Sequence, residues 1–403
     1  MGRRPLIGFL VGTGLLTLAN GMFNLLVGPA VESRGHTEAV IGVIVATGSL
    51  SSLALRIPAG NVFRADRATA LVWSGAVLAA IGYALVPTVS AAPVLAMLSA
   101  LQGAGFAVAT TAGMAALMDR RPAQVGAGTL MGWYTGSIGL GYALAGFLGG
   151  ALGDAIGLQG ALGVAAGAAV VSGWVTAWSI GRLPRHAADV DAAAPPLRGW
   201  IRGMPAGVWF GFAIALYINL VNGGMNAFFP LYALGLGLTL SQVGALSGIH
   251  AILASTVRFG AGAVLGRISS WRVSMAMVAL TGLGVVAITL PGGFLALVPL
   301  VAIVGLARGV LRVVSGAIVM ETAGSSRLGG RASGIYLAGL DLGNAVGPLI
   351  GGVVSELAGL RGSFVVLGVV PAAVFLASGA ALSARGSSLE PTGGRAAVTP
   401  EGP

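Results

Sequence analysis

The sequence predicts an all-α membrane protein with twelve transmembrane helices, arranged as two parallel repeats of six helices each. Three observations carry this prediction: a composition dominated by apolar residues, twelve apolar stretches long enough to cross a bilayer, and an internal repeat with one constant offset.

The composition lies far from that of a water-soluble protein. Of the 403 residues, 56% are hydrophobic and 8% are charged, whereas about a quarter of the residues in a soluble domain are charged. A water-soluble enzyme is therefore excluded, and the absence of cysteine excludes disulfides and thiolate metal sites. The net charge of +10 comes from arginines that stand between apolar stretches. They do not cluster beside aromatic residues, so no nucleic-acid partner is expected.

Twelve apolar stretches have the length of about 20 residues that crosses a hydrocarbon core of roughly 30 Å. They cover residues 5–27, 39–59, 68–87, 93–117, 126–150, 157–181, 205–231, 242–265, 272–290, 295–319, 331–353 and 361–383. The longest polar connection separates the sixth stretch from the seventh. We therefore expect an N-terminal six-helix bundle at 1–181, a cytoplasmic linker at 182–204, a C-terminal six-helix bundle at 205–384 and a disordered cytoplasmic tail at 385–403.

The arginines indicate the orientation, because basic residues of short loops stay on the cytoplasmic side. With the N-terminus inside, the outer loops hold only Arg34 and Arg361. The cytoplasmic segments hold Arg3, Arg4, Arg64, Arg67, Arg120, Arg121, Arg182, Arg185, Arg198, Arg202, Arg267, Arg272, Arg327, Arg331, Arg385 and Arg395. This asymmetry predicts a multi-pass protein of the cell (inner or plasma) membrane with both termini in the cytoplasm.

The internal repeat relates the two halves at one constant offset in residue number. Asn20, Gly21 and Asn24 match Asn222, Gly223 and Asn226. The same offset pairs Arg56 with Arg258, Gly60 with Gly262, Met118-Asp119 with Met320-Glu321, Tyr134 with Tyr336, and Gly157-Leu158 with Gly359-Leu360. Six spans followed by six in the same orientation predict parallel repeats related by an axis along the membrane normal.

Two loop segments carry a resemblance to a known family. Gly60-Asn-Val-Phe-Arg64-Ala-Asp66-Arg67 and its second-half copy Gly262-Ala-Val-Leu-Gly266-Arg267 are similar to the loop between helices two and three of the major facilitator superfamily. That loop typically reads Gly-x-x-x-Asp-Arg/Lys-x-Gly-x-Arg/Lys-Arg/Lys, and Arg64 stands at its aspartate position. The chain resembles this family over nearly its whole length, which implies the family's fold of twelve helices and a transport function.

A second motif resembles one branch of that superfamily. Gly343-Asn-Ala-Val-Gly347-Pro348-Leu-Ile-Gly351-Gly352 in the eleventh span matches Gly-x-x-x-Gly-Pro-x-x-Gly-Gly, which proton-coupled drug exporters often carry in helix five. Helix five here has a proline-less version of this string. Gln102-Gly103 matches the end of an exporter motif of helix four, with Ser99 at the position of its arginine. The resemblance implies export of a small compound, with the glycines and Pro348 acting in helix packing.

Three ionic residues are predicted near the bilayer midplane. Asp341 lies ten residues from Arg331, or about 15 Å along a helix. Arg308 reaches a similar depth, and Arg312 lies one turn further on the same face. A charge at this depth costs about 3 kcal/mol on insertion scales, so it normally faces a cavity or a partner. We expect Asp341 to pair with Arg308, either as a fixed ion pair or as a coupling site that takes up a proton when an anionic substrate engages the arginine.

Uncharged polar residues are further candidates for substrate contacts. Asn20 with Asn24, and Asn222 with Asn226, share a helix face in each repeat. In the superfamily helices one, four, seven and ten line the central path, so these amides either contact substrate or hold helices together. Tyr134 and Tyr336 are related candidates. His250 is either a group that titrates near neutral pH or a packing residue, and since no second ligand stands at metal spacing we expect no metal and no cofactor.

A gate is predicted at the cytoplasmic ends of the helices. Asp119 and Glu321 end helices four and ten at the level of Arg56 and Arg258. We expect Asp119 to meet Arg64, Arg67 or Arg56, and Glu321 to meet Arg258, Arg267 or Arg272, close to Gly60 and Gly262. The alternative is that the arginines only anchor the helices at the membrane surface.

These features together predict a secondary transporter that works by alternating access. The chain has no lysine and so no phosphate loop, which leaves an ion gradient, most simply of protons, as the energy source. The preferred function is efflux of a small organic compound by proton antiport, by a monomer in a lipid bilayer. The alternatives are uptake or exchange of an organic anion, which Arg308 and Arg312 favour, and a receptor or scaffold that does not transport. No paired carboxylates, histidine cluster or nucleophile motif indicates an enzyme.

Overall fold

The computed structural model describes residues 3–62, 66–119, 127–182, 204–265, 269–290, 292–323 and 326–384. Within these ranges all regular structure is helical, as the sequence predicts. The N-terminal half contains α1 (Arg3–Glu32), α2 (Glu38–Val62), α3 (Ala68–Leu85), the short 3-10 helix η1 (Val86–Thr88), α4 (Ala92–Asp119) and α5 (Ala127–Arg182). The C-terminal half contains α6 (Ala206–Gly235), α7 (Leu240–Leu265), α8 (Ser270–Ala287), α9 (Phe294–Ala323) and α10 (Ser326–Ala384).

Two of these helices are too long to be single membrane spans. α5 has 56 residues and α10 has 59, more than twice the length of about 20 residues that one crossing needs. Each bends sharply at one glycine with a left-handed backbone: Gly157 has φ 74° and Gly359 has φ 72°. Only glycine adopts this conformation without steric cost. Each helix thus forms two arms, and the ten long apolar helices of the described residues supply the twelve predicted crossings.

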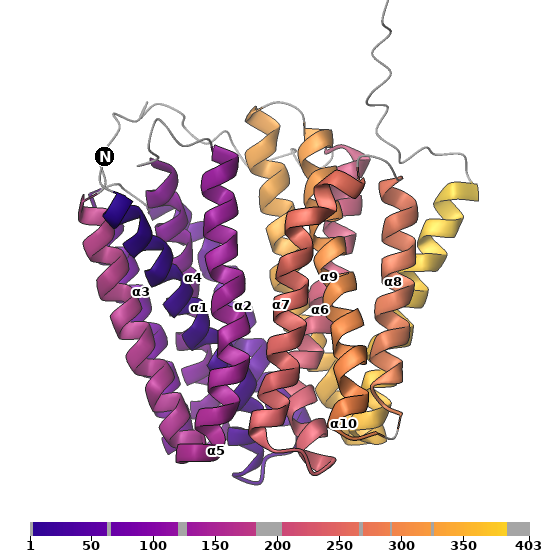
Figure 1. Cartoon of the computed structure of the whole chain (residues 1–403), viewed down its shortest axis with the longest axis horizontal. Helices are drawn as coiled ribbons and strands as arrows, with labels where there is room; N and C mark the ends of the chain where they lie inside the picture. The colour runs from indigo at the N-terminus through magenta and orange to yellow at the C-terminus, as the bar shows by residue number, and fades with distance from the viewer. Residues whose placement is uncertain are drawn as a thin grey trace, which may run out of the picture.

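The two halves share one helical plan and lie side by side (Figure 1). α7, α8 and α9 begin at the repeat positions of the first residues of α2, α3 and α4, and the bends at Gly157 and Gly359 keep the same offset. Gly35 and Gly237, in the turns before α2 and α7, are a further pair at this offset, with φ of 80° and 84°. The sequence repeat is therefore a repeat of backbone structure.

The start of α1 and the end of α10 lie at one end of the bundle, at the top of Figure 1. We call this end the terminal side, and the end that holds the bends at Gly157 and Gly359 the bend side. Trp174 and Trp178 are exposed near the terminal end of α5, and the Arg182 guanidinium stacks over the Trp178 ring at 4.0 Å. Exposed tryptophan beside arginine is typical of a membrane–water interface.

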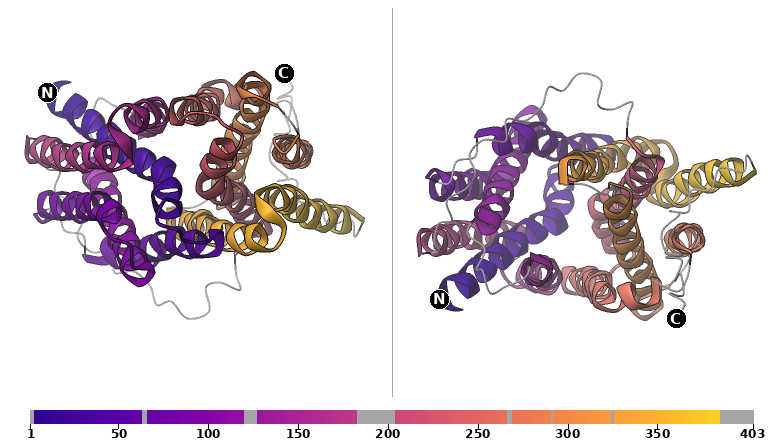
Figure 2. Two further views of the ribbon diagram at one scale, coloured as in Figure 1. Left: turned by 90° about the horizontal axis from the view of Figure 1, so that it is seen from below. Right: turned by 90° about the horizontal axis from the view of Figure 1, so that it is seen from above.

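Glycines bring the two halves into contact toward the bend side. Here α2 packs on the first arm of α10, and the first arm of α5 packs on α7 (Figure 2). A Cβ atom at Gly352 would lie 2.8 Å from the Glu38 carbonyl oxygen, and one at Gly146 would lie 2.6 Å from the Gly244 carbonyl oxygen. Real Cβ atoms do not approach a carbonyl so closely, so glycine at these positions permits this close contact between the halves.

Candidate functional site

An ion pair joins the two halves near the middle of the bundle. The Nε atom of Arg56 on α2 lies 2.6 Å from an Oδ atom of Asp341 on α10. Asp341 is buried, and the Arg56 side chain is 30% exposed. The two residues lie at the same depth, because Arg56 is as far along α2 from its first residue, Glu38, as Asp341 is along α10 from the bend at Gly359. The expectation that Asp341 pairs with Arg308 is therefore wrong.

The glycines of α10 explain why Asp341 faces α2. Gly339 and Gly343 lie on the face that packs against α6: Cβ atoms there would lie 2.9 Å from the Phe212 carbonyl oxygen and 2.6 Å from that of Leu216. Asp341 stands two residues from each glycine, and two residues turn an α-helix by about 200°. Close packing of the glycine face on α6 thus turns Asp341 to the opposite side, toward Arg56.

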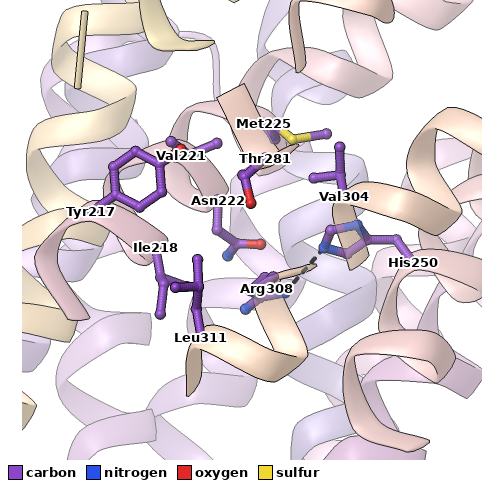
Figure 3. A pocket seen from close by; sticks show the side chains of 10 residues that line it. All are labelled: Tyr217, Ile218, Val221, Asn222, Met225, His250, Thr281, Val304, Arg308 and Leu311. Carbon is purple, nitrogen blue, oxygen red and sulfur yellow. Dashed lines mark hydrogen bonds between the residues drawn. The ribbon is translucent and has the colours of Figure 1, made fainter. Parts of the chain in front are cut away.

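A second polar group lies wholly within the C-terminal half. His250 on α7 and Arg308 on α9 contact each other, with 3.2 Å between the His250 Nε2 and an Arg308 terminal nitrogen (Figure 3). The His250 Nδ1 lies 3.3 Å from the Val301 carbonyl oxygen. Gly305 lets the two helices approach, since a Cβ atom there would lie 2.5 Å from the His250 carbonyl oxygen. The close packing of α7 on α9 thus places the ring beside the guanidinium.

The two contacts of the His250 ring define its tautomer. A guanidinium can only donate hydrogen bonds, so Nε2 accepts from Arg308 and Nδ1 carries the hydrogen that is donated to Val301. The ring is therefore neutral in this arrangement. Protonation of Nε2 would remove the hydrogen bond and place two cations side by side.

These two side chains line a small pocket between α6, α7, α8 and α9 (Figure 3). Asn222 also lines it, beside Arg308 in the view. The remaining lining residues are Tyr217, Ile218, Val221, Met225, Thr281, Val304 and Leu311. The predicted candidates Asn222, His250 and Arg308 thus meet at one place, whereas Arg312 is half-buried one turn further along α9 and does not line this pocket.

Asn20, the repeat partner of Asn222, lies in a hydrogen-bonded cluster. Its Oδ1 accepts hydrogen bonds from Gln102 Nε2 at 2.8 Å and from the Tyr83 hydroxyl at 3.2 Å. Its Nδ2 donates to the Tyr142 hydroxyl at 3.0 Å. This cluster joins α1, α3, α4 and α5, so Asn20 holds helices together, which is one of its two expected roles. Sequence reasoning missed Tyr83 and Tyr142.

The other predicted polar residues are spread over several places. Asn24 is half-buried and Asn226 is exposed. Tyr134 is buried against Phe9, with 6.3 Å between ring centroids. Tyr336 shares a hydrogen bond of 3.2 Å with the Ser315 hydroxyl of α9.

Sequence reasoning also missed Asn219, one turn before Asn222 on the α6 surface that packs on α10. It donates a hydrogen bond of 2.8 Å to the Leu340 carbonyl oxygen and so supports α10 next to Asp341.

Most residues of the predicted gate cannot be placed from the residues that the structure describes. Arg64 and Arg267 lie outside the described residues, and so do the surroundings of Gly60, Asp119, Arg258 and Gly262. Arg67 and Glu321 are exposed. Arg56, which we expected in this gate, pairs with Asp341 deeper in the bundle.

The glycines of the predicted packing motif lie at helix contacts. Gly347 packs on the Leu220 carbonyl oxygen of α6, and Gly351 lies against the Phe228 ring. Gly352 and Pro348 face α2 of the other half, at Glu38 and Gly42.

A family model described as the Major Facilitator Superfamily matches residues 9–330, well over half of the chain. The chain belongs to the Major Facilitator Superfamily. This superfamily member is therefore a multi-pass membrane transporter and not an enzyme. A search of curated protein sequences gives no match.

Solved structures of superfamily members have the same fold. A bacterial homolog of the human lysosomal transporter Spinster, in an inward-facing and unoccupied conformation, matches with a TM-score of 0.80 and 15% identity, over 97% of this chain and 99% of that chain. The nucleoside transporter NupG matches with a TM-score of 0.75 and 15% identity, over 95% of this chain and 99% of that chain. At such identities the likeness concerns the fold alone.

Proposed function

We propose that this transporter exports a small organic solute in exchange for protons, with Asp341 as the proton-binding carboxylate and Arg56 as its charge partner. The observation that carries the proposal is the contact of 2.6 Å between these two side chains, one from each half. Alternating access moves one half against the other. The distance between the two members of an ion pair that joins the halves therefore changes during transport. Protonation of Asp341 removes the pair and shifts the balance between the two conformations.

The contacts between the halves support a state that is closed at the bend side. Gly146 and Gly352 pack there on backbone of the opposite half. The arginine-rich segments support a cytoplasmic location for the terminal side, with both termini inside the cell and the closed end outside. The proposal is thus of a transporter that works as a monomer in the cell membrane and is open toward the cytoplasm in this conformation.

Transport in inverted membrane vesicles tests the role of Asp341. Benzoate and ethidium would serve as an anionic and a cationic probe, with and without an imposed pH gradient. We expect Asp341→Asn to abolish gradient-driven flux and to spare exchange of labelled for unlabelled probe, because exchange needs no net proton movement. Glu356→Gln is the matched control, since Glu356 is an exposed carboxylate on the same helix. Gradient-driven flux that persists in Asp341→Asn would contradict the proposal.

Uptake or exchange of an organic anion is the second candidate function. It is favoured by Arg308, whose guanidinium lines the pocket of the C-terminal half. Flux of benzoate into the cell, or benzoate exchange that ignores the pH gradient, would favour this function over proton-driven export.

A further inference from the structure

A carboxylate of the N-terminal half caps a helix of the C-terminal half. Asp154 lies near the end of the first arm of α5, on the bend side (Figure 1). Its two Oδ atoms accept hydrogen bonds from the backbone N–H groups of Leu240, at 3.1 Å, and Ser241, at 2.8 Å, which are the first two residues of α7. The first N–H groups of a helix have no partner within the helix, and the helix dipole favours an anion at this end. Asp154 therefore satisfies two backbone groups that belong to the other half.

α7 also has a cap that is built from its own half. The Gln242 N–H group donates to the Thr239 hydroxyl at 3.3 Å, and the Thr239 N–H group donates to the Gln242 Oε1 at 3.0 Å. This reciprocal pair is a capping box. The N-terminus of α7 thus has one cap from within the C-terminal half and one from across the boundary between the halves, and each can be removed without the other.

The matching position of the repeat holds a different arrangement. At the offset of the repeat, Asp154 corresponds to Glu356 on α10, and Leu240 corresponds to Glu38, the first residue of α2. Glu38 already places a carboxylate at the N-terminus of α2, which repels a second one. Glu356 is exposed. The cap across the halves is therefore a feature of the contact between α5 and α7.

Close packing beside the cap makes its two hydrogen bonds depend on the contact between the halves. Gly150 packs on the Leu240 carbonyl oxygen, and a Cβ atom at Gly153 would lie 2.9 Å from the Leu240 Cδ1. Alternating access rocks the halves against each other. A movement that separates α5 from α7 at the bend side breaks both hydrogen bonds of Asp154 and leaves the capping box of α7 intact.

We propose that Asp154 is a latch of the bend side, whose hydrogen bonds to the first turn of α7 stabilise the conformation with the halves in contact there against the conformation that is open on this side. The latch acts on the conformational equilibrium of the transporter. It holds for either direction of transport and for any coupling ion, so it does not rest on the proposed export.

Cysteine labelling tests the latch, because the chain has no cysteine and an introduced thiol is the only target. Ala39→Cys places the thiol on α2, at a half-buried position against Gly352 of the other half and at a contact that Asp154 does not form. The purified transporter in lipid nanodiscs is treated with a water-soluble maleimide. The labelling rate rises with the population that is open on the bend side.

The variants are compared in the Ala39→Cys background. Asp154 is exposed, so water competes for its oxygens and the expected effect is that of a helix cap. We expect Asp154→Ala to raise the labelling rate about three- to tenfold, because loss of a cap shifts an equilibrium by this order. Asp154→Asn should raise it less, because the amide keeps one acceptor oxygen. An unchanged labelling rate in Asp154→Ala would overturn the proposal.

Gln242→Ala is the matched control. It removes the capping box from the same end of α7 and leaves the hydrogen bonds to Asp154 in place, so we expect the labelling rate to stay unchanged. An equal rise in Gln242→Ala and Asp154→Ala would show that fraying of α7 exposes the thiol, and it would overturn the latch. A melting transition verifies that each variant is folded, and Asp154→Asn provides the test if Asp154→Ala does not fold.

Discussion

Asn20 and Asn222 occupy equivalent positions in the two halves and have different surroundings. Asn20 is buried with hydrogen bonds to three side chains from three other helices. Asn222 is equally buried and faces a pocket beside Arg308 (Figure 3). The same amide thus serves helix packing in one half and a candidate binding site in the other.

The neighbours of the two asparagines explain the difference, because they do not follow the repeat. At the offset of the repeat, the polar partners of Asn20, which are Tyr83, Gln102 and Tyr142, correspond to Val285, Val304 and Asn344. Conversely, His250 and Arg308 correspond to Gly48 and Phe106. The duplicated backbone is shared, and the polar interior has specialised. The comparison distinguishes an N-terminal half whose buried asparagine joins helices from a C-terminal half whose equivalent asparagine lines a pocket.

The largest expected effect on stability comes from replacing Asn20, the residue on which this comparison depends. Asn20→Leu removes the partner of two hydroxyl groups and one amide in a buried place, and each buried polar group without a partner costs about 1–3 kcal/mol, with smaller values in membrane proteins. We expect the free energy of unfolding in mixed micelles to fall by about 2–3 kcal/mol.

Asn222→Leu is the matched control for this measurement. Among the residues that the structure describes, its side chain lies in no comparable cluster, so we expect a change of less than about 1 kcal/mol. Equal destabilisation by the two variants would contradict the proposed division between the halves.

Most of the fold could be predicted from the sequence. Each span needs about 20 apolar residues, and a charged residue rarely lies within one, so hydropathy alone locates the helices. The repeat offset then relates the halves. What hydropathy does not give is the continuity of α5 and α10 through short bends, because a helix that ends in a loop and one that bends at Gly157 have the same apolar pattern.

The site was harder to predict, because the sequence gives the depth of a residue in the membrane but not the direction in which its side chain points. Asp341 and Arg308 have similar depth, but pairing also depends on which face each helix turns to its neighbour. Arg56 was assigned to the end of its helix, whereas α2 continues to Val62. The signal that was available is the spacing Gly339, Gly343, Gly347, which marks the α6 face of α10 and leaves Asp341 on the opposite face.

A smaller effect on stability is expected at the two bends, where it tests whether the halves share the same backbone conformation. Gly157→Ala and Gly359→Ala add a side chain where φ is 74° and 72°, with no other atom within 4 Å of the new Cβ. Both glycines combine this positive φ with a ψ of 169°, a region that essentially only glycine populates and that costs another residue about 1–3 kcal/mol. We expect both variants to lower the free energy of unfolding by about 1–2 kcal/mol, and by equal amounts.

Gly163→Ala is the control for these two bends, because Gly163 lies in a regular part of α5 and also has free space around it. Alanine is favoured over glycine in a helix, so this variant is expected to leave stability unchanged or to raise it. Unequal effects at Gly157 and Gly359 would show that the halves differ in backbone as well as in their polar interior.

The smallest expected effect concerns coupling within the cluster around Asn20. Tyr142→Phe removes one hydrogen bond, worth about 0.6 kcal/mol in a membrane protein. In the Asn20→Leu background that bond is already lost, so we expect Tyr142→Phe to cost close to zero there. Tyr232→Phe, which removes a hydrogen bond to the Ile288 carbonyl oxygen in the other half, should cost the same in both backgrounds. If Tyr142→Phe cost the same in both backgrounds, the hydroxyl would draw its stabilisation from elsewhere, and the side chains around Asn20 would not act as one hydrogen-bonded cluster.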